Sequence, residues 1–243
     1  MKRLVSVLTA LALPGSVLAQ APAALPTVTP TPVTSHSWKA RDVALSIGGL
    51  ILLSGMLDNS VHLESQNLRG VVSDRVAAIG NEFGNGRRVI PLLGAAWVIG
   101  TATGSERVRD VAGHTLQAGL TAGLAATTLK FLTGRDRPNG GTDADHFSPL
   151  RTGDTSFPSG HTALAFGVAT ALANEFEGTW DDVGLYGLAT LTGLSRINDD
   201  KHWLSDVLGG AAIGVLAGRW ATRSHRQLPI AVGPSGIGFS FSF

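Results

Sequence analysis

Apolar runs recur along the chain between residues 38 and 221 and predict a helical protein. Six of them are longer than ordinary strands, are rich in Ala, Leu and Gly, and lack the apolar-polar alternation of a half-buried strand. They cover residues 43–57, 89–103, 111–131, 161–176, 183–194 and 203–220. We therefore expect an all-α fold, a bundle of about six helices.

The segment between the first two runs, residues 58–88, is more polar and shows no sharp periodicity. We interpret it as a connection that contains one short helix at residues 68–79. Glycines follow a clearer pattern near the end of the chain, where Gly210, Gly214 and Gly218 lie four residues apart and share one face of the last predicted helix. Such a face lets the backbone of a neighbouring helix approach closely.

The first residues of the chain have the pattern of a secretory signal peptide. Lys2 and Arg3 form a basic start, residues 4–13 are apolar, and a small-residue cleavage site ends at Ala19. We expect residues 1–19 to be removed and the protein to be exported to the periplasm. An uncleaved membrane anchor is the alternative, although the apolar stretch is short for a bilayer span.

The remaining boundaries follow from changes in composition. Residues 20–37 are rich in Pro, Ala and Thr, which predicts an extended linker rather than a helix. The helical domain is expected at residues 38–223. Residues 224–243 end in alternating Phe and Ser, which predicts a short extended tail or a strand.

The lengths of the apolar runs bear on membrane insertion, because a spanning helix needs about 20 apolar residues. Most of the runs are shorter than that or are closely flanked by charged residues, and the mean hydropathy of +0.20 is modest. We therefore expect a water-soluble or peripheral bundle. A multi-pass protein of the inner membrane is the alternative.

Composition limits the chemistry that the chain can perform. It has no cysteine, which excludes disulfides, thiolate catalysis and cysteine zinc sites. Its 19 basic and 18 acidic side chains give a net charge of +1, so nothing global indicates nucleic acid as a partner. Any basic binding site must therefore be local.

Three clusters of polar residues stand at the ends of predicted helices. They are Lys130 with Arg137-Pro138, the run Pro158-Ser159-Gly160-His161, and Ser195-Arg196 with His202 and Asp206. Taken singly, each has an ordinary structural explanation as a helix-terminal cation, an N-cap or a surface pair. Taken together, they fit the binding and cleavage of a phosphate monoester.

Five residues are candidates for binding the phosphate. Arg137 and Arg196 offer forked donors to phosphate oxygens, and Lys130 adds a point charge. Ser159 and Gly160 place backbone N–H groups at a helix start, where an anion is favoured. Three cations suit a phosphoryl group better than a lone carboxylate.

Three more residues are expected to carry the reaction. Asp206 lies one helical turn after His202 and can orient its ring, leaving the other ring nitrogen free to attack phosphorus. His161 is the candidate acid that protonates the leaving oxygen. The expected course is a phosphohistidine intermediate followed by hydrolysis, with no metal and no cofactor.

The order and spacing of the three clusters resemble the three signatures of the type 2 phosphatidic acid phosphatase superfamily, which is related to bacterial class A acid phosphatases and vanadium haloperoxidases. The motifs lie within residues 130–206, and the helix pattern extends the similarity to about 38–221. The resemblance implies a helical bundle and the roles given above. Residues 1–37 and those after Arg223 lie outside it.

Other functions stay open at this point. A vanadium-dependent haloperoxidase would hold vanadate in the same pocket, but such enzymes are usually much longer. A metallohydrolase could use His161, His202 and Asp206 as ligands, although three nearby cations would repel the metal. A non-catalytic helical protein could bind phosphate or lipid headgroups. The substrate is a lipid phosphate or a small soluble phosphomonoester, and membrane association and oligomerisation are left open.

Further polar residues are secondary candidates. Asp143, Asp145, His146 and Asp154 lie between the first two clusters and are expected to border the pocket entrance. Asp199 and Asp200 precede His202 and either moderate the positive field or cap a helix. His114 is interpreted as a packed helix residue.

Overall fold

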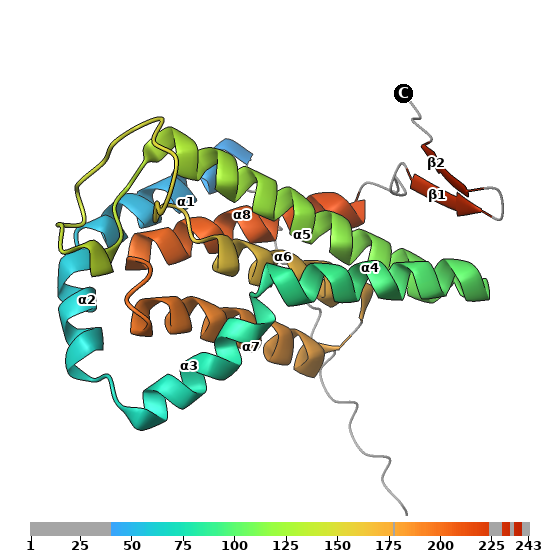
Figure 1. Ribbon diagram of the computed structural model, residues 1–243, viewed down its shortest axis with the longest axis horizontal. Helices are drawn as coiled ribbons and strands as arrows, with labels where there is room; N and C mark the ends of the chain where they lie inside the picture. The colour runs from blue at the N-terminus through green and yellow to red at the C-terminus, as the bar shows by residue number, and fades with distance from the viewer. Residues whose placement is uncertain (1–39, 177, 224–229, 234–235, 240–243) are drawn as a thin grey trace, which may run out of the picture. The chain divides into compact units, whose positions relative to one another are not determined.

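The computed structural model describes residues 40–176, 178–223, 230–233 and 236–239, and these form helices and one short hairpin (Figure 1). The α-helices are α1 (Ala40–Gly55), α2 (Asp58–Asn67), α3 (Val71–Phe83), α4 (Gly86–Thr103), α5 (Glu106–Thr133), α6 (Gly160–Glu175), α7 (Thr179–Asn198) and α8 (Leu204–Arg223). A short 3₁₀ helix, η1 (Pro138–Gly140), follows α5.

The all-α class is confirmed, and each of the six predicted helices has a counterpart. The prediction for residues 58–88 is wrong in detail, because this segment holds two helices, α2 and α3, in place of a connection with one short helix. Its weak periodicity has a physical reason. In α2 only the polar Asp58 is buried, so this helix shows no apolar stripe. Helix α3 does carry apolar residues, but most of them are exposed and only the small Ala77 and Gly80 are buried.

Helix α6 lies at the centre of the bundle and packs against α5, α7 and α8. The core between α5, α6 and α8 consists of small side chains, including Ala122, Ala126, Ala163 and Ala217. Small residues let helix backbones lie close together, so the ends of these helices are brought close as well.

The glycine face of α8 is confirmed and is packed against α6. A methyl group added at Gly214 would lie 2.4 Å from the carbonyl oxygen of Ala163 and 2.7 Å from the backbone nitrogen of Gly167. Gly210 and Gly218 meet α6 equally closely. This approach places the start of α8 beside the start of α6, where two of the predicted clusters lie.

We expect Gly214→Ala to destabilise the protein by about 1–3 kcal/mol, because the methyl group collides with backbone that cannot move without separating the helices. Gly94→Ala in α4 is the control, since a methyl group there meets nothing within 4 Å. That control should be neutral or stabilising by up to about 1 kcal/mol, because Ala favours helix. Denaturant unfolding followed by far-UV circular dichroism measures both. Equal stability of the two variants would contradict the packing described here.

The C-terminal segment contains an antiparallel pair, β1 (Ile230–Gly233) and β2 (Gly236–Phe239), in which Ile230 faces Phe239 and Gly233 faces Gly236. The predicted extended tail therefore includes a hairpin. The predicted signal peptide and linker, and residues 240–243 of the Phe/Ser run, lie outside the described residues.

Within residues 40–176 and 178–223, no helix combines the length and apolar character that a bilayer crossing requires.

Candidate active site

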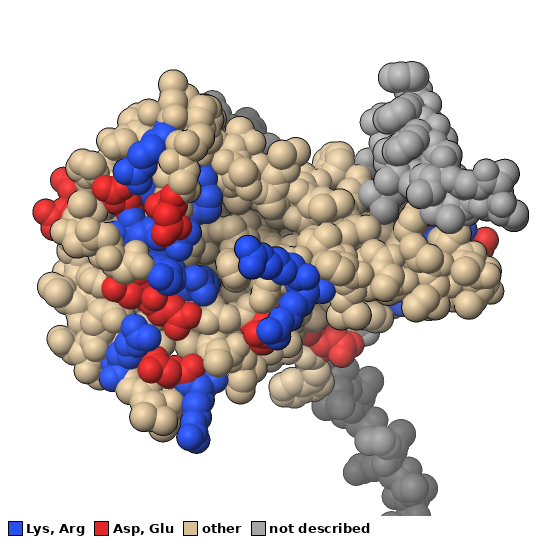
Figure 2. Space-filling model, viewed as in Figure 1, with Lys and Arg blue, Asp and Glu red and all other residues tan. Residues whose placement is uncertain are grey.

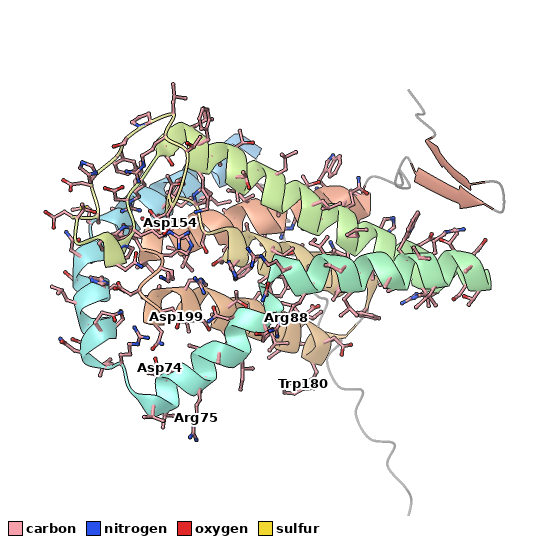
Figure 3. All side chains as sticks on the ribbon, in the orientation of Figure 1. Asp74, Arg75, Arg88, Asp154, Trp180 and Asp199 are labelled. Carbon is pink, nitrogen blue, oxygen red and sulfur yellow. The ribbon has the colours of Figure 1, made fainter. Side chains whose placement is uncertain are left out.

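The three clusters meet at one end of the bundle. Helices α5 and α7 end there, and α6 and α8 begin there, beside α2 (Figure 1). Asp154, on the loop before α6, and Asp199, at the end of α7, lie at this same end (Figure 3). Charged side chains gather over it, whereas the face along α4 and α5 carries few of them (Figure 2). The site is thus assembled from helix termini.

Lys130 reaches the site from the last turn of α5. The helix ends at Gly134, whose φ of 58° is left-handed and whose N–H donates to the Lys130 carbonyl oxygen at 2.9 Å. The Lys130 ammonium donates to the carbonyl oxygens of Thr155 and Ser156, at 2.6 and 2.8 Å. Burial, assisted by the charge of Arg137, lowers the pKa of Lys130 to about 8.

Arg137 and Arg196 each keep at least one buried donor unused. Arg137 pairs with the exposed Asp154 at 2.8 Å, while Arg196 donates to the side-chain oxygen of Asn81 at 2.7 Å and lies 3.4 Å from Asp199. The Nε atoms of both arginines are buried and have no hydrogen-bond partner among the described residues. Buried donors usually have partners, so these two indicate a site for an acceptor that is bound from outside.

The start of α6 is capped by Ser159, whose hydroxyl oxygen accepts from the Thr162 N–H at 3.4 Å and from the Thr162 hydroxyl at 2.8 Å. The Ser159 N–H donates to the backbone oxygen of Asp206 at 2.9 Å. The prediction that this N–H binds phosphate is therefore wrong, because α8 already occupies it. The side chain of Ser159 and the N–H of Gly160 stay available as donors. A methyl group at Gly160 would meet nothing within 4 Å, so a ligand has room there.

His161, the next residue of α6, lies in the field of all three cations. Burial lowers its pKa to about 4, and the charges of Arg196, Arg137 and Lys130 act in the same direction. An opposing contribution comes from Asp199. The imidazole is therefore neutral near pH 7 when no anion is bound.

His202 and Asp206 form a buried pair at the start of α8. The Nδ1 atom of His202 lies 3.4 Å from Oδ2 of Asp206, and that oxygen also accepts the Trp203 N–H at 2.9 Å. His202 is 3% exposed and Asp206 is fully buried. Since Nδ1 faces the carboxylate, Nε2 is the ring nitrogen that can attack.

The charge states of this pair follow from its surroundings. Burial lowers the pKa of His202 to about 4, and the charges of Lys130 and Arg137 act with it, whereas Asp206 opposes them. Burial alone would raise the pKa of Asp206, but the hydrogen bond to His202 and the charge of Arg135 lower it. At neutral pH the site holds a neutral imidazole beside a carboxylate, which is the state that a nitrogen nucleophile needs.

The polar residues of the loop between α5 and α6 were predicted to border the pocket entrance, and the structure shows two of them in ion pairs with nearby residues. Asp154 is exposed and pairs with Arg137. His146 pairs with Asp136 at 2.6 Å through its Nδ1 atom. Asp145 lines a separate hollow. His114 packs at the other end of the bundle, where its Nδ1 atom lies 2.6 Å from a Glu175 oxygen.

Two residues near the site were missed because they lie in the segment 58–88. Asn81 of α3 accepts from Arg196 and donates to Asp199 at 2.6 Å, and so fixes the position of the arginine. His62 of α2 packs edge-on against Trp203, with ring centroids 5.3 Å apart. The only sequence signal for either was a polar residue in a stretch without periodicity.

An apolar groove of about 320 Å³ lies between α4, α5 and α6 and reaches the start of α6. Gly160 and His161 contribute to its lining, together with Ile90, Leu120 and Leu124. Glycines of α4 and α5 also line it, so its floor approaches the helix backbones. The described residues contain no group of three or more His, Asp or Glu side chains placed to hold a metal ion.

Residues 112–229 match the family model of the PAP2 superfamily. Lipid A 1-phosphatase from Porphyromonas gingivalis is 39% identical over 117 residues, which cover 47% of this chain and 23% of that protein. Lipid phosphate phosphatase 1 from Arabidopsis thaliana is 30% identical over 144 residues, covering 47% of this chain and 44% of that protein. The chain therefore spans less than half the length of either relative.

Two solved structures share the fold. LpxE from Aquifex aeolicus superposes with a TM-score of 0.54 at 26% identity, covering 69% of this chain and 95% of that one. A transmembrane PAP2-type phosphatidylglycerolphosphate phosphatase from Bacillus subtilis gives a TM-score of 0.57 at 22% identity, covering 74% and 94%. At 22% identity, the similarity to the second structure supports the shared fold alone.

Proposed function

Because the chain belongs to the PAP2 superfamily, we propose that it is a phosphatase that hydrolyses a lipid phosphate monoester with His202 as nucleophile. The observation that carries this proposal is the pair of buried, unpartnered Nε donors of Arg137 and Arg196. Together with Lys130, they lie close enough to His161 to lower its pKa. A phosphoryl group would supply the acceptors and the negative charge that these donors lack.

The proposed reaction has two displacements at phosphorus. In the first, Nε2 of His202 forms a bond to phosphorus while the bond to the leaving alcohol oxygen breaks, and His161 gives that oxygen a proton. In the second, water attacks the phosphohistidine, His161 takes a proton from the water, and the N–P bond breaks to release phosphate. Asp206 stabilises the positive ring of His202 in both steps, and the three cations stabilise the equatorial oxygens.

The protonation of His161 depends on the bound anion. Its pKa of about 4 in the empty site leaves it neutral at pH 7. A bound phosphoryl group brings negative charge next to the imidazole and offsets the three cations, which raises the pKa of His161 again. The substrate thereby helps to create the acid that completes its own cleavage.

The apolar groove favours a lipid over a small soluble phosphate ester. It is lined by His161, the proposed acid, so the leaving group would lie along Leu120 and Leu124. An acyl chain in this groove would be removed from water, whereas a small polar alcohol would leave apolar surface uncovered. The names of the two relatives, a lipid A phosphatase and a lipid phosphate phosphatase, agree with this choice.

A substitution in the groove separates the two substrate classes. A side chain added at Gly123 of α5 starts in open space, so Gly123→Leu fills the groove without disturbing helix packing. We expect kcat/KM for phosphatidate to fall about 10-fold or more, while kcat/KM for p-nitrophenyl phosphate changes less than about 2-fold. Gly187→Leu, at an exposed open site on α7, is the matched control. Equal losses on both substrates would argue against the groove as a lipid site.

A substrate panel tests the proposed function itself. Phosphate release is measured from phosphatidate, a polyprenyl diphosphate and p-nitrophenyl phosphate, with and without detergent. We expect release from at least one lipid with a higher kcat/KM than from the nitrophenyl ester. Absence of release from all three would overturn the phosphatase proposal.

The pKa of Lys130 predicts a fall in activity in the alkaline range. A pKa of about 8 means that Lys130 is a cation below pH 8 and neutral above it, so phosphate binding weakens as the pH rises through that value. We expect kcat/KM, which reports on the free enzyme, to decline above about pH 8. In Lys130→Arg the guanidinium keeps its charge, and the decline should move to higher pH. An identical alkaline limb in wild type and variant would contradict this assignment.

The site of action is also part of the proposal. We place the mature protein in the periplasm at a membrane surface, with residues 1–19 as signal peptide, 20–37 as linker and 38–223 as catalytic domain. Support comes from the end of α1 and the turn after it, where Leu52 and Met56 are 77% and 79% exposed. Cell fractionation with an alkaline carbonate wash, and N-terminal sequencing that is expected to begin at Gln20, test this placement.

A further inference from the structure

Arg135 is a buried arginine that belongs to none of the three clusters. It lies just after the end of α5 and is 4% exposed. Its Nε donates to the carbonyl oxygen of Ala144 at 2.7 Å, and its Nη2 donates to Oδ2 of Asp58 at 2.7 Å. Its Nη1 donates to the Ser205 hydroxyl at 2.7 Å and to Oδ1 of Asp206 at 2.8 Å. All three guanidinium nitrogens are therefore engaged with protein acceptors.

The two oxygens of Asp206 have different partners. Oδ1 accepts from Arg135, whereas Oδ2 accepts the Trp203 N–H and faces Nδ1 of His202. A carboxylate is planar, so a bond to one oxygen fixes the direction of the other. Arg135 thus sets the rotation of the Asp206 side chain, and with it the oxygen that His202 meets.

Asp58, the first residue of α2, holds Arg135 in place. It is fully buried, and its Oδ1 accepts the Ser205 N–H at 2.8 Å. Its Oδ2 accepts both from Arg135 and from the Ser205 hydroxyl, the latter at 2.5 Å. A buried arginine needs a counter-charge, and Asp58 supplies one to Arg135. Arg135 can therefore bind Asp206 while the Asp206 carboxylate keeps part of its negative charge.

Two aromatic rings confine the guanidinium further. The Cζ atom of Arg135 lies 5.3 Å from the centroid of the Phe147 ring and 5.6 Å from that of Trp203. These distances lie within the range of cation–π contacts. The arginine is thus restrained by charge, by hydrogen bonds and by packing.

We propose that Arg135, held by Asp58, is a positioning residue that orients the Asp206 carboxylate and through it the nucleophilic His202. Its role in turnover rests on the proposed function. Its role in orienting the His202 ring is a property of the folded protein and can be measured without a substrate.

The test uses Asp58→Asn, which keeps the shape of the side chain and removes its charge. We expect kcat for phosphatidate to fall about 10- to 100-fold with KM within about 3-fold of wild type, since the phosphate-binding cations are untouched. Asp136→Asn is the matched control: Asp136 is adjacent to Arg135 but pairs with His146 and Arg151. Its kcat should stay within about 2-fold of wild type.

A spectroscopic readout separates positioning from general damage. In ¹⁵N-histidine-labelled protein, the Nδ1 resonance of His202, assigned with His202→Gln, should shift in Asp58→Asn and stay in place in Asp136→Asn. Ser205→Ala keeps both charges and removes the hydroxyl between them, so a smaller shift and a smaller loss of kcat are expected. If Asp58→Asn does not fold, Ser205→Ala is compared with wild type in its place.

The outcomes are distinct. A wild-type kcat in Asp58→Asn, or an unmoved His202 resonance in both folded variants, would overturn the positioning role. If the wild-type protein releases no phosphate from any substrate, the proposed function fails, and the His202 resonance alone then supports or overturns the positioning of its ring.

Discussion

His202→Ala is expected to reduce kcat for lipid phosphate hydrolysis by at least about 1000-fold, because no other group in the site can replace the attacking nitrogen. His202 is 3% exposed, and its Nδ1 faces Asp206, so its Nε2 is the nitrogen left for the proposed attack on phosphorus. The substitution leaves Lys130, Arg137 and Arg196, the cations proposed to bind phosphate, unchanged. Steady-state phosphate release from phosphatidate in detergent measures the loss.

His114→Ala is the control for this experiment. His114 is likewise a histidine paired with a carboxylate, but it is only partly buried and lies with Glu175 at the other end of the bundle. Its kcat should stay within about 2-fold of wild type. Equal phosphate release from His202→Ala and wild type would contradict the proposed role of His202. It would favour a protein that only binds phosphate or lipid headgroups.

Asp206→Asn should lower kcat by about 10³- to 10⁴-fold, the size of loss seen when the carboxylate that orients a catalytic histidine becomes an amide. The amide removes the charge that stabilises the ring of His202 when it becomes positive. It also leaves Arg135 with Asp58 as its one close carboxylate partner. KM should change little, since Lys130, Arg137 and Arg196, which are proposed to bind the phosphate, keep their positions.

Asp74→Asn is the control for Asp206→Asn. Asp74 pairs with Arg69 at 2.9 Å, and its side chain is 48% exposed, so its loss should leave kcat within about 2-fold of wild type. Initial rates over a range of substrate concentrations separate kcat from KM. A kcat for Asp206→Asn within 10-fold of wild type would show that the carboxylate does not orient the nucleophile.

The sequence could predict those parts of the site whose residues lie close together in the chain or are spaced by one helical turn. Ser159 and His161 lie in one short stretch at a helix start, and His202 and Asp206 lie one turn apart, so their proximity follows from chain geometry. The four-residue spacing around Gly214 likewise predicted the face of α8 that packs on α6. In these cases the relevant partners are close in sequence or repeat with the helix period.

The contacts that sequence could not reveal join residues far apart in the chain. Arg135 binds Asp58 across 77 residues, and Arg196 binds Asn81 across 115. Asp58 begins a polar helix without an apolar stripe, and Asn81 lies beyond the short helix predicted at residues 68–79, so the sequence marked neither residue as part of a helix. Which polar side chain meets which arginine depends on how α2 and α3 pack at the end of the bundle.

The wrong detail at Ser159 has a similar origin. A helix start ordinarily offers free N–H groups to an anion. Here α8 approaches α6 so closely that the Asp206 carbonyl oxygen accepts the Ser159 N–H at 2.9 Å. The glycine face of α8 was visible in the sequence, but the hydrogen bond that it permits required the packed structure.

The central claim, that His202 is the nucleophile, is tested most directly by trapping the phosphoryl enzyme. Wild-type protein is mixed with ³²P-labelled lipid phosphate, quenched in alkali within a single turnover and digested, and the labelled peptide is sequenced by mass spectrometry. We predict an acid-labile, alkali-stable phosphoryl group on His202. Label on another residue, or full turnover without label on the protein at any time, would contradict the mechanism.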